Sequence, residues 1–166
     1  MSRAFVKEND LEHAGIDVPE RPISAEKNYV TPNGLKELEN NILLLEQEKN
    51  KLSNTSDYSN KQKKSQLERD LRYFIKRLES AILVNPDDQD KNKVLFSAFV
   101  QVENELGDIS KFQIVGEDES NIKLNKIAYT SPLAKSIIGS KKDDEILWHK
   151  PSGSEYLTIV NIEYKI

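Results

Sequence analysis

The chain has 166 residues, of which 31% are charged and 37% hydrophobic, and its formal net charge is −4; this suits one ordinary domain, or a small domain with an appendage. It contains no cysteine and only two histidines, His13 and His149, so disulfides and thiolate metal sites are excluded and a histidine-based catalytic or metal cluster is not expected. No apolar run approaches a membrane span and no signal-peptide core follows Met1, so we expect a cytoplasmic protein. The net charge argues against general nucleic-acid binding but leaves room for local basic patches.

Residues 1–30 show no sustained helical or strand period. Residues 18–22, which read Val-Pro-Glu-Arg-Pro, predict an extended chain because a proline disfavours helix at the residue before it. We therefore expect residues 1–30 to form an extended N-terminal tail that is mobile or lies on the surface.

Residues 31–84 have the pattern of a helical hairpin. Two apolar runs step at three and four residues, as in the seam of a coiled coil, and a small polar break at 53–60 separates them. Two such seams predict an antiparallel pair of helices, each about 33 Å long at 1.5 Å per residue. The first seam comprises Leu35, Leu38, Ile42, Leu45 and Leu52, and the second comprises Leu67, Leu71, Phe74, Leu78 and Ile82.

The first helix has signals at both ends. Thr31 can cap it and Pro32 suits its first position, while acidic residues such as Glu37 lie early and basic ones such as Lys49 lie late, as the helix dipole favours. Because the apolar seam is narrow, an arm that projects from the protein is favoured over two helices packed on a core.

The second helix is basic near its start. Between Lys61 and Glu79 it carries seven basic residues against three acidic ones. Two interpretations stay open: an ordinary solvated face, or an electrostatic strip that meets phosphates. A solvated face is the usual outcome for such a run, and basic residues near a helix N-terminus, which oppose its dipole, are a small argument for the functional interpretation. The candidates for an RNA-facing or polymerase-facing strip are Lys61, Lys63, Lys64, Arg69 and Arg72.

The C-terminal half changes to the period of strands. Residues 85–92 predict a linker by composition. Strands are predicted at residues 94–102, 109–115, 126–129, 145–149 and 156–164, with a short helix at 133–138 that Ser131 and Pro132 open and Gly139 stops. The predicted fold class is therefore α+β, an N-terminal coiled-coil hairpin followed by a small antiparallel sheet domain with one short helix. The predicted segments are a tail at 1–30, the hairpin at 31–84, a linker at 85–92 and the sheet domain at 93–166.

Several short motifs along the chain follow a familiar order. They are Val30–Leu38 at the first helix, Arg69–Tyr73 in the second, Val94–Ala98 and Phe112–Glu119 in the sheet domain, Ser131–Lys135 before the short helix and Ile162–Tyr164 in the last strand. In this order and at this spacing they resemble the Gre-factor family of bacterial transcription elongation factors, GreA and GreB.

The resemblance implies a C-terminal domain like that of FK506-binding proteins, which docks on the rim of the secondary channel of RNA polymerase while the coiled coil enters that channel. In the family, acidic residues at the coiled-coil tip help hold a second Mg²⁺ at the polymerase active site, where the ion activates water that cleaves backtracked RNA. RNA polymerase is therefore the expected partner, and the RNA 3′ end is a further candidate contact. The chain is expected to be a monomeric accessory factor without a membrane partner. It is not expected to be an enzyme, nor to bind a cofactor of its own beyond sharing the polymerase Mg²⁺.

The tip departs from the family pattern. Of the family's acidic tip motif, only Asp57 and Tyr58 fit here, and the Asp and Glu that carry the metal role are absent. The first helix is also about two heptads shorter, which removes roughly 20 Å of reach. We therefore expect weak or no stimulation of transcript cleavage, because small misplacements are already costly. Asp57 itself is either a carboxylate near the polymerase metal or a simple helix cap.

The candidate docking turn is Thr130-Ser131-Pro132-Leu133. In the family an acidic residue often precedes Ser-Pro, whereas Thr130 stands there in this chain. Read without the resemblance, Ser131 and Pro132 are only a helix cap; read with it, they form a polymerase-docking turn. Two functions from other classes also stay open: a prolyl isomerase, suggested by the expected domain fold although fold does not imply activity, and a coiled-coil holdase.

Overall fold

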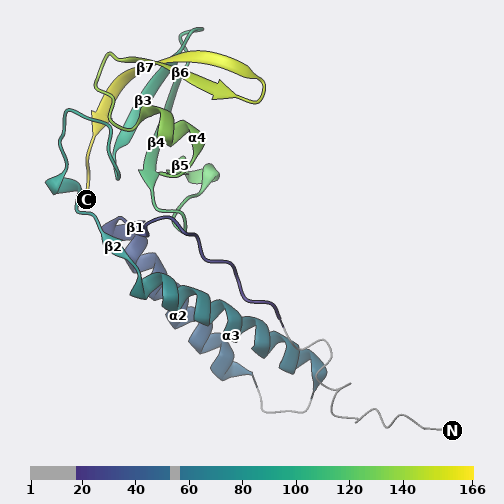
Figure 1. The fold of residues 1–166 in the computed structure, drawn as a ribbon. Helices are drawn as coiled ribbons and strands as arrows, with labels where there is room; N and C mark the ends of the chain where they lie inside the picture. Colours follow the sequence, from purple (N-terminus) through teal and green to yellow (C-terminus); the bar gives the residue numbers. More distant parts are fainter. Residues whose placement is uncertain (1–17, 53–56) are drawn as a thin grey trace. The chain divides into compact units, whose positions relative to one another are not determined.

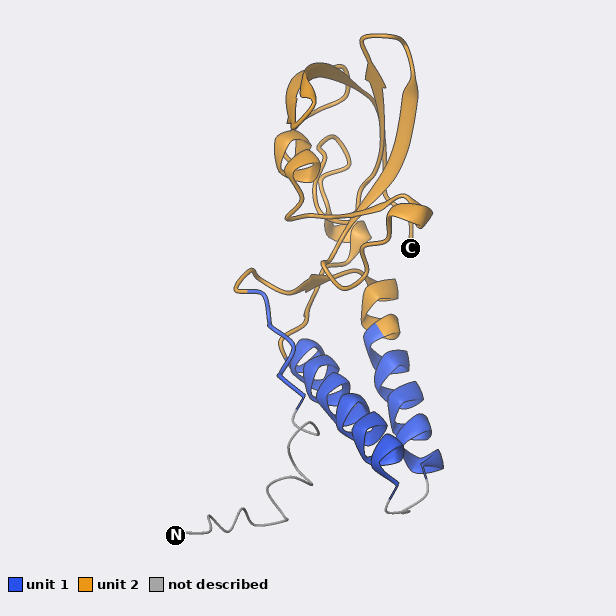
Figure 2. Ribbon diagram, turned by 90° about the vertical axis from the view of Figure 1, so that its right-hand side faces the viewer, with its two compact units in different colours: residues 1–24, 38–79 blue, residues 25–37, 80–166 orange. Residues whose placement is uncertain are grey.

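The computed structural model describes residues 18–52 and 57–166 (Figure 1). The chain divides into two compact units: unit 1 contains residues 1–24 and 38–79, and unit 2 contains residues 25–37 and 80–166 (Figure 2). Residues 1–17 of the predicted tail and residues 53–56 of the predicted tip lie outside the described residues. The two units do not correspond to the four segments predicted from the sequence, and that four-part division stays a prediction.

Two long helices confirm the predicted hairpin. Helix α2 spans Pro32–Lys51 and helix α3 spans Tyr58–Glu79, so they are about 30 and 33 Å long at 1.5 Å per residue. They run antiparallel, and most of both belongs to unit 1 (Figure 2). Leu67 and Leu71 of the predicted seam are buried, and Lys49 Nζ lies 3.3 Å from Glu68 Oε1 on the facing helix.

The predicted end of the second helix is wrong. α3 ends at Glu79, and Ile82 lies in strand β2 (Ile82–Leu83), which pairs in parallel with β1 (Tyr29–Val30). The Ile82 amide donates to the carbonyl of Asn28, and the Val84 amide donates to that of Val30. β-Branched residues favour such extended pairing over a further helical turn. The same pairing places the last residues of the predicted tail in a strand.

Unit 2 is built on a five-stranded sheet. Its strands are β3 (Phe99–Asn104), β4 (Ile109–Val115), β5 (Lys126–Ala128), β6 (Glu145–Lys150) and β7 (Gly153–Glu163), in the order β5-β4-β3-β7-β6. Neighbouring strands are antiparallel except β4 and β5, which are parallel. The short helices are α4 (Pro132–Ile137), η1 (Pro86–Asp88) and η2 (Ile122–Leu124). This confirms the α+β class, while the likeness to FK506-binding proteins stays a prediction.

The first predicted strand begins too early. β3 starts at Phe99, and Ser97 just before it has a positive φ of 71°, which interrupts an extended strand. Ala98, Val100 and Val102 are buried in one core together with residues such as Ile114. Phe96 lies outside this core, beside the rings of Tyr29 and Tyr129. The predicted strand is therefore present, but it begins at Phe99 rather than at residue 94.

No helix in the described part of the chain is long and apolar enough to span a membrane.

Candidate functional site

The start of α2, up to Glu37, belongs to unit 2 and is held by a buried carboxylate of the same unit. The Thr31 Oγ1 atom accepts the amide of Gly34 at 2.9 Å, which makes Thr31 the predicted cap. The same hydroxyl donates to Glu119 Oε2 at 2.6 Å, and Asn33 Nδ2 and Lys126 Nζ donate to Glu119 Oε1 at 3.1 and 3.3 Å. The side chain of Glu119 is only 3% exposed, so its charge is balanced by these donors rather than by water.

This arrangement corrects the predicted source of negative charge at α2. The first turn of α2 contains no acidic residue, and Glu37 lies beyond that turn, 3.8 Å from Lys126 Nζ. The carboxylate that faces the positive end of the helix dipole belongs to Glu119, 88 residues from Thr31 along the chain. In the sequence, Glu119 was only the last residue of the Phe112–Glu119 motif.

Two glycines permit the close packing around this carboxylate. A Cβ atom at Gly34 would lie 2.6 Å from Glu119 Oε2, and one at Gly116 would lie 2.3 Å from the carbonyl oxygen of Tyr29. Both distances are far below van der Waals contact. These glycines are the signal in the sequence that could have indicated a close contact between the α2 start and the loop after β4.

The described part of the predicted tip begins α3. Asp57 Oδ1 accepts the amide of Ser59 at 3.2 Å, and the Asp57 carbonyl accepts the amide of Lys61. Asp57 is therefore a helix cap, while its role near a metal stays a prediction. Tyr58 is 52% exposed. No group of three or more acidic, cysteine or histidine side chains that could hold a metal occurs among the described residues.

The five residues of the predicted basic strip do not share one face of α3. At 3.6 residues per turn, Lys63 lies about 160° around the helix from Lys61, whereas Lys64, Arg69 and Arg72 lie nearer to Lys61. Lys61, Lys63 and Lys64 are all exposed. Their contact with RNA or polymerase stays a prediction.

The two arginines of the strip contact acidic residues within unit 1. Arg69 donates from Nε and Nη2 to Asp70 Oδ1 at 3.0 and 2.9 Å. Arg72 donates from Nε at 2.9 Å, and also from Nη2, to Glu20 Oε1. These hydrogen bonds lower the pKa of Glu20 and raise the pKa of Arg72, so both groups are charged at neutral pH.

Glu20 belongs to the segment at residues 18–24, here called the N-terminal strap, which runs along α3 (Figure 1). The next residue, Arg21, places its guanidinium carbon 3.8 Å from the ring centre of Tyr73 and 5.1 Å from that of Phe74. Arg21 Nη1 also lies 3.6 Å from Asp70 Oδ1. Over residues 18–24 the predicted extended chain therefore lies on the surface of α3. No sequence pattern indicated these contacts.

The candidate docking turn lies before α4 in unit 2. Ser131 caps α4, since its hydroxyl oxygen accepts the amide of Ala134 at 3.3 Å. Pro132 is exposed, Leu133 packs against the core and Thr130 is half-buried. The predicted cap is confirmed, and a docking role for these four residues stays a prediction.

An aromatic cluster packs around Tyr129, the residue before the candidate docking turn. Tyr129, next to Thr130, packs edge-on against Tyr29 and Phe96, with ring centres 5.4 and 5.8 Å apart. The Tyr129 hydroxyl donates to the carbonyl of Lys27. The backbone leading into the candidate docking turn is therefore anchored, whereas Pro132 remains accessible.

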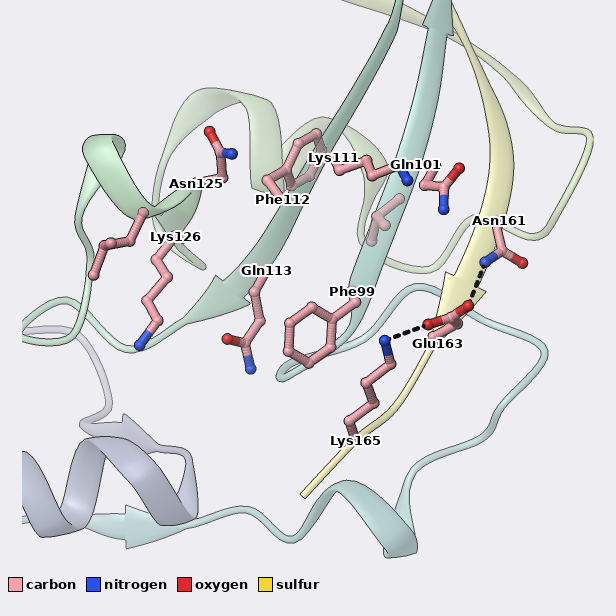
Figure 3. Close-up of a pocket in the computed structure, with 12 residues that line it drawn as sticks. Phe99, Gln101, Lys111, Phe112, Gln113, Asn125, Lys126, Asn161, Glu163 and Lys165 are labelled. Carbon is pink, nitrogen blue, oxygen red and sulfur yellow. Dashed lines mark hydrogen bonds and ion pairs between the residues drawn. The ribbon is translucent and has the colours of Figure 1, made fainter.

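A hollow of about 350 Å³ lies in unit 2, and residues of the sheet line it (Figure 3). Phe99 and Phe112 are its aromatic lining residues, of which Phe112 also belongs to the core. The polar lining residues come from β3, β4, β7, the segment after η2 and the segment after β7. Glu163 in its wall is paired with Lys165 at 2.9 Å and with Asn161 at 3.0 Å, and the hydrogen bond from Lys165 is the largest cause of its lowered pKa. The other polar lining residues are Gln101, Lys111, Gln113, Asn125 and Lys126.

Comparison with known proteins identifies the family. The family model "Transcription elongation factor, GreA/GreB, C-term" matches residues 89–164. The chain is 31% identical over 156 residues to transcription elongation factor GreB of Yersinia pestis, a match covering 85% of this chain and 91% of that protein. The chain belongs to the GreA/GreB family. Its relation to GreB of Neisseria meningitidis serogroup B is similar, with 31% identity over 154 residues and coverage of 83% and 94%.

Two further matches are shorter or less similar in sequence. GreB of Pseudomonas aeruginosa is 38% identical over 94 residues, and this match spans 57% of the chain but only 56% of that relative's length. A solved structure of GreA/GreB from Nitrosomonas europaea has 20% identity and a TM-score of 0.42, with 84% of this chain and 99% of that chain covered.

Proposed function

We propose that this GreA/GreB-family chain is an accessory factor that binds bacterial RNA polymerase at its secondary channel and regulates elongation. The docking turn Thr130–Leu133 supplies the polymerase contact, and the α2–α3 hairpin enters the channel. The observation that carries the proposal is family membership, shown by relatives that match nearly their whole length. Any RNA cleavage is performed by the polymerase active site, with the factor at most sharing its Mg²⁺.

The tip supports only weak stimulation of cleavage. Its single carboxylate, Asp57, already accepts the amide of Ser59 as a helix cap. One carboxylate in that role is a poor substitute for a well-placed pair that holds a second metal ion, because catalysis depends on placement within about 1 Å. The proposed action is therefore occupancy of the channel, in competition with other factors that enter it.

Binding to the polymerase is tested by competition. The full chain is expected to co-purify with core RNA polymerase and to be displaced by GreB of Yersinia pestis. Pro132→Ala should weaken this binding while unit 2 stays folded, because Pro132 is exposed at the docking turn. Pro151→Ala, which changes an exposed proline in the turn between β6 and β7, is the matched control and should bind as the unmodified chain does. Co-purification that GreB cannot reduce would contradict a shared site.

The structure gives no specific support for a prolyl isomerase. Such enzymes need a deep pocket lined by aromatic rings, whereas the hollow in Figure 3 has two rings among eight polar side chains. Phe96 and Tyr129 pack with Tyr29 instead, and the Tyr164 hydroxyl is used by the amide of Leu95 and the carbonyl of Lys93. The accessory role in transcription is therefore the function we propose.

A further inference from the structure

The hollow in unit 2 is built on two neighbouring rows of the five-stranded sheet. In one row, Phe99 of β3 pairs with Gln113 of β4 and with Glu163 of β7. In the next row, Gln101 of β3 pairs with Lys111 of β4. Because directly paired residues on neighbouring strands lie about 5 Å apart, these five side chains meet around one place on the sheet (Figure 3).

Phe99 is an aromatic residue that does not belong to the core cluster. Along β3 it precedes the core residue Val100, so the two side chains lie on opposite faces of the sheet. The ammonium of Lys165, whose side chain is 63% exposed, lies 5.4 Å from the centre of the Phe99 ring. A flexible side chain therefore reaches this ring from solvent, and a flat group that enters the hollow can stack on it.

Two side-chain amides lie beside the ring. Gln101 and Gln113 are both half-buried and line the hollow. Among the residues that the structure describes, neither side-chain amide has a hydrogen-bond partner. Each amide has donors and an acceptor, and its partial burial removes part of its contact with water. The pair therefore suits a ligand whose edge carries both donors and acceptors.

The charged residues of the hollow favour an anion. Three lysines and one glutamate line it, a formal balance of +2. Lys165 lies 2.9 Å from Glu163, which is the one lining carboxylate. Lys126 lies 3.3 Å from the buried Glu119. Lys111 is exposed and has no ion pair within the described part of the chain, so it is the cation most available to a ligand.

We propose that this hollow is a binding site for a nucleoside 5′-phosphate. The base stacks on Phe99, and its edge forms hydrogen bonds with Gln101 and Gln113. The phosphate pairs with Lys111. An aromatic face, polar groups that bind the base edge and a nearby cation are the elements by which proteins recognise individual nucleotides. The volume of about 350 Å³ lies at the lower end of the range of small-ligand pockets, which suits a single nucleotide.

This inference does not rest on the proposed function, and its test uses no polymerase. The full chain is titrated with adenosine 5′-monophosphate (AMP) and followed by ¹H–¹⁵N NMR. The amide signals of residues 99–101 and 111–113 should shift, while those of β6, which does not line the hollow, should not. AMP should bind about tenfold more tightly than ribose 5′-phosphate, because stacking of the base on an aromatic ring contributes at least this factor.

The role of the ring is tested by Phe99→Leu, which keeps an apolar side chain. This variant should bind AMP about tenfold more weakly and should lose the preference for AMP over ribose 5′-phosphate. Tyr156→Leu removes an exposed ring from the same sheet outside the hollow. As the matched control, it should bind AMP as the unmodified chain does.

The role of charge is tested by two substitutions with opposite expected effects. Lys111→Gln should weaken AMP binding about threefold and Glu163→Gln should tighten it about threefold, since exposed charges contribute on this scale. Both effects should shrink at high salt. Lys142→Gln, at an exposed lysine outside the hollow, is the control. Thermal unfolding shows that each variant is folded, and the exposed Lys111 keeps the test valid if Phe99→Leu is not.

The proposal is overturned if AMP leaves the signals of the hollow unchanged, or if ribose 5′-phosphate binds equally well, which would leave a general anion site. Equal weakening by Lys111→Gln and Lys142→Gln would also overturn it. An acidic peptide containing phenylalanine that displaces AMP at equal concentration would assign the hollow to a protein partner. An oligoadenylate that binds more tightly per nucleotide than AMP would assign it to RNA.

Discussion

The first amides of each long helix need a hydrogen-bond acceptor, and the two helix starts provide it in different ways. At the start of α2, Thr31 caps the helix and the buried Glu119 adds a carboxylate from a distant loop. At the start of α3, the exposed Asp57 caps the helix with its own side chain. The first is a buried network with several members, and the second is a local contact in water. Substitutions at α2 should therefore change stability, while those at α3 should change mainly what the protein binds.

The largest effect is expected for Glu119→Ala. It leaves Lys126 without its buried partner and removes the acceptor of Thr31 and Asn33, so the free energy of unfolding of unit 2 should fall by about 3 kcal/mol. Urea denaturation followed by circular dichroism measures it. Glu105→Ala, at an exposed turn, serves as the control and should remain within about 0.5 kcal/mol of the original chain. Equal losses for both variants would show that the α2 start is not a buried network.

Gly116→Ala should be the next most damaging change. The new Cβ would lie 2.3 Å from a backbone oxygen of Tyr29, which cannot move without breaking the β1–β2 pairing, so a loss of about 2 kcal/mol is expected. At Gly34 the obstructing atom is the end of the Glu119 side chain, and alanine favours the helix. Gly34→Ala should therefore cost less in the same denaturation experiment. The reverse order would contradict the geometry around Glu119.

Ser97→Gly should stabilise unit 2. Ser97 has a φ of 71° and is fully buried, and its Oγ has no hydrogen-bond partner among the described residues. Glycine adopts this φ without strain and removes the unpaired hydroxyl, so a gain of about 1 kcal/mol is expected. The melting temperature should rise accordingly. Ser97→Ala, which removes the hydroxyl but keeps the strain, should gain less.

Asp57→Asn should leave stability within about 0.5 kcal/mol of the original chain, since asparagine caps helices as well as aspartate does. This is the counterpart at α3 of the change at Glu119. The same variant separates the two roles of Asp57 in transcription assays. If Asp57→Asn abolishes an effect on the polymerase without changing stability, Asp57 acts as a carboxylate near the polymerase metal. If the effect on the polymerase is unchanged, Asp57 is only a helix cap.

The smallest effect concerns the charge on Glu20. Its pKa is lowered below the ordinary value of 4.5, chiefly by the hydrogen bond with Arg72. The contribution of this contact is thus present above that ordinary value and is lost as the pH falls through the lowered pKa. NMR titration should show the strap leaving α3 in this acidic range. In Glu20→Gln this step should be absent, and a step that persists there would assign it to another group.

How much the sequence predicts differs between local and distant contacts. The period of leucines predicted both long helices, and Thr31, Ser131 and Gly139 marked element ends correctly because capping depends on neighbouring residues. Ile82 and the residues before Phe99 were misassigned because strand pairing depends on a partner elsewhere in the chain.

The same limit applies to the candidate site. The sequence indicated Asp57, the strip and the docking turn as short motifs. It did not predict that Glu119 faces the start of α2, or that Glu20 and Arg21 cover Arg72 and Tyr73, since these contacts join residues 52 or more positions apart. The sequence of a loop or an extended tail is the same whether or not its side chains contact a distant part of the chain.

The proposed action by channel occupancy is tested most directly by transcript cleavage. Backtracked transcription complexes are saturated with this chain, with binding verified by competition, and cleavage of the RNA 3′ end is compared with that produced by GreB of Yersinia pestis. We predict cleavage close to the rate of polymerase alone, because the tip offers only Asp57. Cleavage at the rate of GreB would contradict the proposal.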